Sequence, residues 1–247
     1  MENGKIFSGN ILKILGCIFM FIDHLGAIMF PEVIALRIIG RLAYPIFAFT
    51  LAEGCFHTRN RLKHFLLIFG SAVIIQVVYY FAMKSFSLSI FMIFSISIVL
   101  IYLYDYIHKY SVDILETEEK CNKKFVLWIL FIFLFFLLIV GTIILDNITP
   151  YLKDGYGYQG VLIPVIIYIV MKLSNRNLLI TLIVLAIVLA ISALMRKEFY
   201  NFYSIISVVI LFFYNGTRGK YNLKYFFYIF YPAHIALIYL VNILINN

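Results

Sequence analysis

Charged side chains are what this sequence has least of. Asp, Glu, Lys and Arg together make up 13% of its 247 residues, whereas hydrophobic residues make up 64%. Soluble globular domains contain about 25% charged residues and are about half apolar. A water-soluble chain with so few charges could not cover its own surface. This shortage excludes a soluble enzyme, a nucleic-acid-binding domain and a single-span anchor with an ectodomain. The mean hydropathy of +1.00 instead predicts a polytopic protein of the lipid bilayer.

Cysteine is also scarce. Cys17, Cys55 and Cys121 form no CxxC motif and no ligand-like cluster. We interpret them as packing residues and predict neither a disulfide framework nor a metal site. No repeat of fixed period and no Gly/Ser or Pro linker divides the chain, so we expect a single domain over residues 1–247.

The apolar residues are grouped in runs about as long as the roughly 20 residues that a transmembrane helix requires. We therefore predict an all-α bundle of about nine transmembrane helices, with eight or ten as alternatives. Asp23 and His24 interrupt the first run and no small-x-small cleavage site follows, which favours a retained first helix over a signal peptide. We expect a solvated loop or a short surface helix over the longest connector, 106–124. The nine runs cover residues 11–30, 33–52, 64–83, 88–107, 125–145, 159–173, 177–195, 201–215 and 224–245.

The cations are distributed unevenly between the two sides of this arrangement. With a cytoplasmic N-terminus, 14 of the 20 Lys and Arg residues fall inside and four fall outside. Cytoplasmic loops of membrane proteins carry such an excess, so we predict N-in, C-out topology. The inner cations are Lys5, Lys13, Arg59, Arg61, Lys63, Lys109, Lys120, Lys123, Lys124, Lys172, Arg176, Arg218, Lys220 and Lys224. The outer cations are Lys84, Lys153, Arg196 and Lys197.

Ionisable residues inside a bilayer are costly and usually mark a functional interior. Here they cluster as Asp23 and His24 in the first run, Arg37 and Arg41 in the second, and His234 in the last. The first two runs form a helical hairpin, and helical geometry brings all five residues about 10 Å below the outer surface. We predict that they line one cavity, with Asp23 pairing with an arginine and His24 facing the cavity. Alternatively, the Asp–Arg pair only clamps two helices and each histidine is satisfied by a backbone partner.

A second group of polar residues lies at the predicted inner end of the second helix. Glu53, His57 and Arg61 are spaced i, i+4, i+8, with Arg59 and Asn60 between them. This segment is either a positively charged loop whose side chains snorkel, or an anion site where arginine binds phosphate. The basic loop with Arg218, Lys220 and Lys224 is a second candidate anion site. Neither segment contains a P-loop or GxGxxG motif, so nucleotide hydrolysis is not indicated.

Glycine and proline predict irregular backbone beside the buried charges. Gly40, Pro45 and Gly54 mark the second helix as irregular, and Pro232 precedes His234 by two residues in the last. Proline is tolerated in membrane helices where neighbours or a cavity satisfy the freed carbonyl. The turn-rich segment 154–160 is either an interfacial belt element or a lid over the outer mouth.

Several of these segments together resemble the TraX family. The N-terminal block is the most specific, with MFIDHLG at 20–26, RIIGRLAYPIFAF at 37–49, AEG at 52–54 and HTRN at 57–60. Tyr156, Gly157, Gly160 and the late FYIFYPAH at 227–234 follow in family order. TraX proteins are multi-span membrane acetyltransferases named for acetylation of the pilin N-terminus. They are related to transmembrane acyltransferases that use acyl-CoA.

The resemblance implies a plasma-membrane enzyme that transfers an acetyl group from cytoplasmic acetyl-CoA to an amine or hydroxyl of an exported peptide, pilin or glycan. It makes His24 the general base, with Asp23, Arg41 and His234 as further catalytic residues; Asp23 would fix the arginine that neutralises developing charge. His234 is the second choice of base or a proton relay. The implied cofactor-binding residues are Arg37, Glu53, His57, Arg59, Asn60, Arg61, Arg218 and Lys220.

Two other classes of protein remain open. A small proton-coupled transporter could use Asp23, His24 and His234 as its coupling site, although the sequence shows no inverted repeat, the usual sign of such folds. A membrane scaffold would use the same charges only to fix helix packing. Stabilisation by CoA distinguishes the enzyme from the transporter, because a ligand that binds the folded state raises its stability.

Overall fold

The computed structural model describes residues 5–83, 89–112, 118–148, 157–196, 199–221 and 223–246. Every regular element in these ranges is a helix. An isolated bridge between Phe7 and Tyr214 is the one strand-like pairing recorded there. The all-α prediction is therefore confirmed for the part of the chain that the structure describes.

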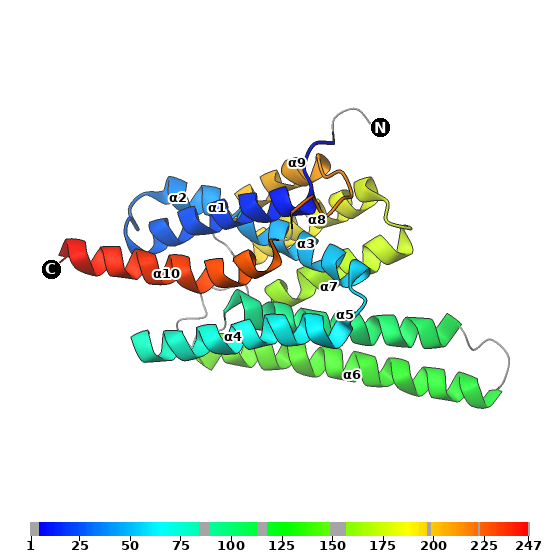
Figure 1. Ribbon diagram of the computed structural model, residues 1–247. Helices are drawn as coiled ribbons and strands as arrows, with labels where there is room; N and C mark the ends of the chain where they lie inside the picture. Colours follow the sequence, from blue (N-terminus) through cyan, green and yellow to red (C-terminus); the bar gives the residue numbers. More distant parts are fainter. Residues whose placement is uncertain are drawn as a thin grey trace. The chain divides into compact units, whose positions relative to one another are not determined.

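Each of the nine predicted runs corresponds to one helix or to two consecutive helices (Figure 1). The second run is divided into α2 and α3, and the eighth into the 3₁₀ helix η2 and α9. The helices are α1 (Gly9–Ile28), α2 (Ile34–Gly40), α3 (Ala43–His57), α4 (Arg61–Met83), α5 (Ile90–Val112), α6 (Glu118–Ile148), α7 (Gly157–Leu173), α8 (Leu178–Arg196), η2 (Phe199–Ile206), α9 (Ser207–Phe212) and α10 (Lys224–Asn246).

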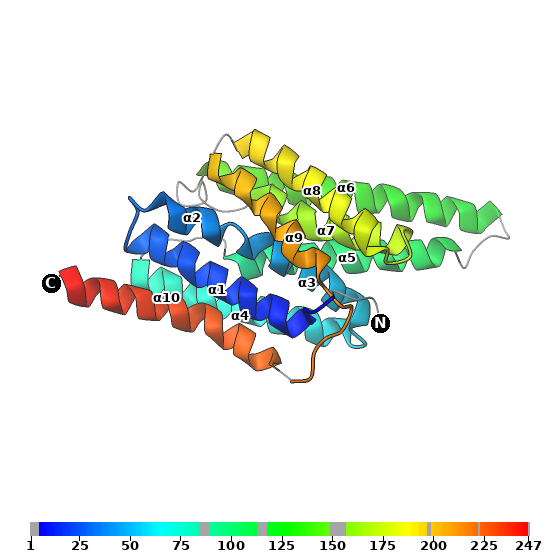
Figure 2. The ribbon, with the colours of Figure 1, turned by 90° about the horizontal axis from the view of Figure 1, so that it is seen from above.

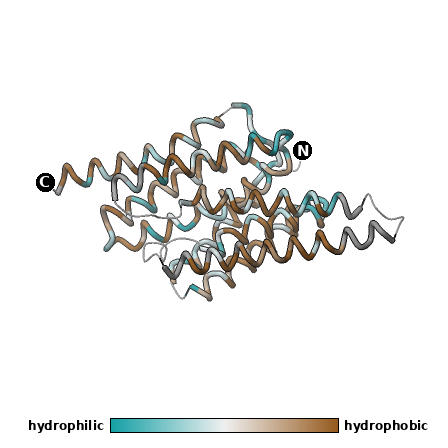
Figure 3. The backbone as a smooth tube through the Cα atoms, turned by 90° about the horizontal axis from the view of Figure 1, so that it is seen from below, coloured by the Kyte–Doolittle hydropathy of each residue, from teal (hydrophilic) through white to brown (hydrophobic). Residues whose placement is uncertain are grey.

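Five helical segments are long and apolar enough to cross a membrane. They are Gly9–Ile28, Ile34–His57, Ile90–Lys109, Leu178–Arg196 and Tyr225–Ile245. Phe125–Gly141, Gly157–Leu173 and Phe199–Phe212 are shorter apolar helices. Hydrophobic residues run along most of the length of these helices (Figure 3).

The helices form two compact units, one of Met1–Glu53 with Val170–Asn247 and the other of Gly54–Ile169. In the first unit, α1 packs against both α2 and α10, and η2 packs against α2, α8 and α9. Figure 2 shows α10 running alongside α1 although most of the chain separates them in sequence. In the second unit, α5 packs against α4 and α6. The expectation of one domain over 1–247 stays a prediction.

The predicted irregularity of the second span is confirmed, because α2 ends at Gly40 and α3 begins at Ala43. Pro45 lies in the first turn of α3, where a missing N–H breaks no helical hydrogen bond. Gly40 also allows α1 and α2 to approach closely. A Cβ atom at Gly40 would lie 2.2 Å from the Cβ of Asp23, so a side chain fits there only if α1 and α2 move apart.

Some predicted segments lie outside the described residues. These are residues 113–117 of the long connector, residues 154–156 of the turn-rich segment, and the outer cations Lys84, Lys153 and Lys197. The flanks of the connector correct our expectation of a loop or a short separate helix. α5 continues to Val112 and α6 begins at Glu118, so both flanks extend the neighbouring long helices.

Candidate active site

The two intramembrane histidines form a pair that joins α1 to α10. His24 Nδ1 lies 2.6 Å from His234 Nε2, and the two rings are nearly parallel, with centroids 4.9 Å apart at 18°. The His234 ring also stacks on the Phe230 ring, with centroids 4.8 Å apart. His234 is buried. His24 and His234 therefore come together, as their predicted common level requires; their depth in the bilayer stays a prediction.

The hydrogen bonds of this pair fix the order of its protons. A carbonyl oxygen can only accept, so His234 Nδ1 donates to the Phe230 carbonyl at 2.7 Å. In the neutral pair His234 Nε2 is then an acceptor, and His24 Nδ1 must be the donor across the 2.6 Å contact. His24 Nε2 is therefore the unprotonated nitrogen of the pair that takes no part in these two hydrogen bonds, and it can take up a proton.

Asp23 and Arg37 form an ion pair across the close contact of α1 with α2. Arg37 Nη1 lies 3.1 Å from Asp23 Oδ2 and also donates to the Asp23 backbone carbonyl at 3.1 Å. The prediction that Asp23 meets an arginine is confirmed. The second oxygen, Asp23 Oδ1, is buried and has no hydrogen-bond partner in the described part of the chain.

Arg41 follows α2 and is buried, with 3% of its surface exposed. Its guanidinium lies 4.8 Å from the ring centroid of Tyr200 in η2, a cation–π geometry. Asp23, His24, Arg37, Arg41 and His234 all belong to the first unit; we call them the histidine site. Within the described ranges, no group of three His, Cys, Asp or Glu residues is placed to hold a metal ion.

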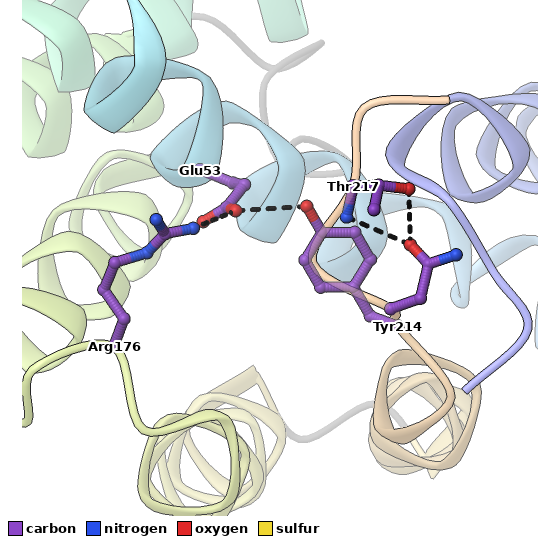
Figure 4. A network of polar contacts seen from close by, with 5 residues as sticks. Glu53, Arg176, Tyr214 and Thr217 are labelled. Atoms are coloured by element: carbon purple, nitrogen blue, oxygen red, sulfur yellow. Dashed lines mark hydrogen bonds and ion pairs between the residues drawn. The ribbon is translucent and has the colours of Figure 1, made fainter. Parts of the chain in front are cut away.

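A second polar site in the same unit centres on Glu53 of α3. Its Oε1 atom accepts from Arg176 Nη2 at 2.6 Å and from the Tyr214 hydroxyl at 3.0 Å. Figure 4 shows the carboxylate between these two side chains. The ordinary pKa of a tyrosine hydroxyl is about 10, so Tyr214 is a neutral hydrogen-bond donor at neutral pH.

Arg176 reaches Glu53 from a strained turn between α7 and α8. Asn175 and Arg176 have φ angles of 52° and 62°, the left-handed region that costs an L-residue about 1–2 kcal/mol. The Arg176 N–H donates to the Met171 carbonyl at 2.7 Å, which closes the end of α7. Asn177 then caps α8 by accepting from Ile180 N at 3.2 Å.

A cavity of about 440 Å³ lies beside this ion pair. Its lining combines three charged side chains, those of Lys5, Glu53 and Arg176, with apolar and polar neighbours. The neighbours include Phe49, Met171, Leu178, Thr181 and the segment Tyr214–Gly216. We call the cavity and its three charged residues the glutamate site.

The loop after α9 is bound to the start of the chain. Phe7 N–H donates to the Phe213 carbonyl at 3.0 Å, and Gly9 N–H donates to the Thr217 carbonyl at 2.8 Å. Arg218 and Lys220 lie in this loop with exposed side chains, a few residues beyond the cavity-lining segment. One of the two predicted anion-binding segments thus lies next to the glutamate site in sequence and in the same unit.

The other predicted anion-binding segment is organised differently from our expectation. α3 ends at His57 and Arg61 begins α4, so Glu53, His57 and Arg61 do not share one helix face. Asn60 caps α4 by accepting from Lys63 N at 2.9 Å. Arg61 forms an ion pair with Asp105 of α5.

Sequence reasoning missed three partners in these networks: Arg176, Tyr214 and Asp105. Asp105 carried a usable signal, since it is an acidic residue inside the predicted span 88–107. Arg176 was counted only as an inner cation. Nothing in the neighbourhood of Tyr214 singles it out among 19 tyrosines.

The fold and the buried polar groups define an all-helical membrane protein with a histidine pair inside it. The chain matches the family model described as "TraX protein" over residues 8–242, and it belongs to the TraX family.

Curated relatives match over shorter stretches. An uncharacterized protein of Rickettsia prowazekii (strain Madrid E) is 40% identical over 68 residues, 28% of this chain and 25% of that protein. A probable fimbrial assembly protein FimC, serogroup H1, of Dichelobacter nodosus is 37% identical over 76 residues, 28% of this chain and 31% of that protein. The chain thus spans about a quarter to a third of the length of these relatives. No solved structure matches the chain.

Proposed function

We propose that this protein is a plasma-membrane acyltransferase that moves an acetyl group from cytoplasmic acetyl-CoA to an amine or hydroxyl of an exported peptide, pilin or glycan. The observation that carries the proposal is the proton order of the histidine pair, which leaves the lone pair on His24 Nε2. Membership of the TraX family, which is associated with pilin acetylation, supports the reaction class.

The proposed topology has nine spans, with the N-terminus inside and the C-terminus outside. Five helical segments have the length and hydropathy of spans, and the other predicted runs also correspond to helices. The excess of cations on one side supports the orientation. Lys5, Arg176, Arg218 and Lys220 are all among the predicted inner cations, which assigns the glutamate site to the cytoplasmic side.

In the proposed reaction, His24 Nε2 takes the proton from the acceptor amine or hydroxyl as that group attacks the thioester carbonyl carbon. A carbon–nitrogen or carbon–oxygen bond forms and the carbon–sulfur bond breaks. The proton then passes from His24 to the departing thiolate, which leaves as the thiol of CoA. His234 holds the His24 ring through the 2.6 Å contact and disperses the charge that the pair gains, which is the positioning role of the second member of such pairs.

The arginines have separate proposed roles. Arg37 is a proposed cofactor-binding residue. Two contacts to Asp23, one to the carboxylate and one to the backbone carbonyl, fix its position, so Asp23 is a positioning residue. Arg41 is buried, where a cation stabilises the negative charge that develops on the thioester oxygen more strongly than in water.

The donor would extend between the two sites. Ten residues of α3 separate Ala43 from Glu53, about 15 Å at 1.5 Å per residue, a span suited to an extended thioester arm. We propose that Glu53, Arg218 and Lys220 lie at the nucleotide end. His57, Arg59, Asn60 and Arg61 belong to the second unit and stay sequence predictions for donor binding. Asn60 caps α4, and Arg61 is paired with Asp105.

The acceptor is proposed from the family and from one relative. The match to a probable fimbrial assembly protein is compatible with a pilin acceptor, and an exported peptide or glycan offers the same amine or hydroxyl. Mass spectrometry of cell-surface peptides and glycans, with and without this protein, tests this directly. A missing acetyl mass would identify the acceptor, whereas identical acetylation profiles would contradict the proposal.

Binding of the donor separates this function from proton-coupled transport. We expect CoA and acetyl-CoA to raise the unfolding temperature of the purified protein in detergent, since a ligand of the folded state adds to its stability. A proton-coupled transporter would show no such shift. The same preparation, reconstituted with acceptor, allows acetyl transfer to be measured directly.

A further inference from the structure

The charge balance of the glutamate site favours an anion. Lys5 and Arg176 contribute two positive charges and Glu53 contributes one negative charge to the lining of a cavity of about 440 Å³. The net charge of the lining is therefore +1. The cavity extends beyond the Glu53–Arg176 ion pair, so it has room for a ligand beside Arg176.

The two partners of the ion pair differ in how firmly they are held. The Glu53 side chain is 11% exposed and the Arg176 side chain is 44% exposed. Glu53 keeps a second partner, the Tyr214 hydroxyl at 3.0 Å, when the guanidinium turns away. Arg176 is the partner that can move toward a ligand, since it projects from an exposed turn.

The backbone at Arg176 argues against a purely structural reason for arginine at this position. A residue with φ of 62° favours glycine or asparagine, which adopt the left-handed region at least cost. This turn directs the Arg176 guanidinium to Glu53, 2.6 Å away, at the edge of the cavity. Strained residues of this kind concentrate at ligand-binding sites.

We propose that the glutamate site is an anion subsite in which Glu53 acts as an internal counter-ion, exchanged for a phosphate group of the ligand. Arg176 and Lys5 bind the phosphate, and Glu53 remains hydrogen-bonded to Tyr214. This inference rests on the proposed function for its ligand, the phosphorylated end of the acyl donor. No covalent step is involved.

The exchange has a signature that a structural clamp lacks. Arg176→Gln removes a charge-assisted hydrogen bond to phosphate, and such bonds are worth about 1.5–3 kcal/mol, so affinity for CoA should fall about tenfold or more. Glu53→Gln removes the competing charge, so affinity for CoA should rise several-fold. A clamp predicts that both changes act in the same direction, because either one breaks the same contact.

The test is calorimetric titration of the purified full-length protein in detergent with CoA and with pantetheine, which lacks phosphate. Arg176→Gln should weaken and Glu53→Gln should tighten CoA binding, while neither should alter pantetheine binding. Lys5→Gln, which leaves the Glu53 ion pair intact, should also weaken CoA binding. Arg196→Gln is the matched control, because this arginine ends α8 and does not line the cavity.

The outcomes separate the subsite from the wider function. If wild type binds CoA and transfers acetyl but all variants bind CoA alike, the subsite is wrong and the proposed function stands. If the wild-type protein does not bind CoA but binds inorganic pyrophosphate in a way that depends on Arg176, the proposed subsite is supported and the proposed function is wrong. If the Glu53 and Arg176 variants unfold, Lys5→Gln decides alone, and its unchanged CoA affinity would overturn the proposal.

Discussion

The histidine site and the glutamate site belong to the same unit but differ in how their side chains are held. Each joins a residue near the start of the chain to one far along it, His24 to His234 and Glu53 to Arg176 and Tyr214. The histidine pair is held by hydrogen bonds and by stacking of His234 on Phe230, whereas the glutamate site has an adjoining cavity.

This contrast teaches how the two sites divide the proposed reaction. Two hydrogen bonds and stacking on Phe230 leave the His234 imidazole little freedom, and a fixed ring with a fixed proton order suits one defined proton transfer. A partly exposed arginine beside a cavity suits reversible binding of a charged ligand. Four substitutions test this division, starting with the change that should have the largest effect.

His24→Ala removes the proposed base and should lower acetyl transfer by at least 100-fold, the lower range for loss of a general base. The protein should remain folded, since His24 is only partly buried. Transfer by the purified, reconstituted variant is the measurement. His108→Ala, a change of the same type in α5, is the control and should transfer normally. Full acetyl transfer by His24→Ala would contradict the proposed catalytic role of the histidine site.

Gly40→Ala should destabilise the protein by about 1–3 kcal/mol, the usual cost of overpacking. The new Cβ would lie 2.2 Å from the Asp23 Cβ and 2.6 Å from its Cα, so α1 and α2 must separate and the Asp23–Arg37 pair must loosen. Thermal unfolding in detergent measures the loss. Gly70→Ala has nothing within 4 Å, and should be neutral or stabilising because alanine favours helix. Equal behaviour of the two variants would contradict the close contact.

Arg176→Gln should raise the KM for acetyl-CoA about tenfold with little change in kcat, because it affects donor binding and not the chemical step. His24→Ala should show the reverse pattern, with the loss in kcat. Steady-state kinetics at varied donor concentration separates the two. A loss in kcat for Arg176→Gln with unchanged KM would show that the two sites do not divide the reaction as proposed.

Tyr214→Phe should have the smallest effect, a loss of about 1 kcal/mol in stability. It removes only the hydroxyl that donates to Glu53 at 3.0 Å and retains the ring, which packs edge-on against Phe49. Chemical or thermal unfolding is the measurement, with the exposed Tyr221→Phe as the matched control. If both variants are equally stable, the hydroxyl contributes nothing to holding Glu53.

Much of the fold could be predicted because hydrophobicity is a local property of the sequence. Each apolar run became a helix or two consecutive helices, and the interruption near Gly40 followed from glycine and proline chemistry. Helical rise brought His24, His234, Asp23 and the two arginines to one level, which agrees with the observed contacts, but it did not predict the direct His24–His234 contact or the choice of Arg37 by Asp23.

The glutamate site could not be predicted in the same way. Its members come from α3, from the turn after α7 and from the loop after α9. The depth of a loop residue cannot be calculated from the helical rise per residue. Arg61 shows the opposite error. Its spacing from Glu53 and His57 suggested one face, but the helix ends at His57 and Arg61 pairs with Asp105 instead.

The division of the chain into a discontinuous and a continuous unit affects biosynthesis. The second unit, Gly54–Ile169, is uninterrupted in sequence, so its helices can pack together as soon as they have been synthesised and inserted. The other unit needs both ends of the chain, and His24 meets a partner 210 positions later. Asp23 can meet Arg37 as soon as α2 has been made, but His24 has no His234 partner until the last helix has been synthesised. The proposed catalytic pair forms only after α10 has been inserted, so an incomplete chain would lack the proposed activity.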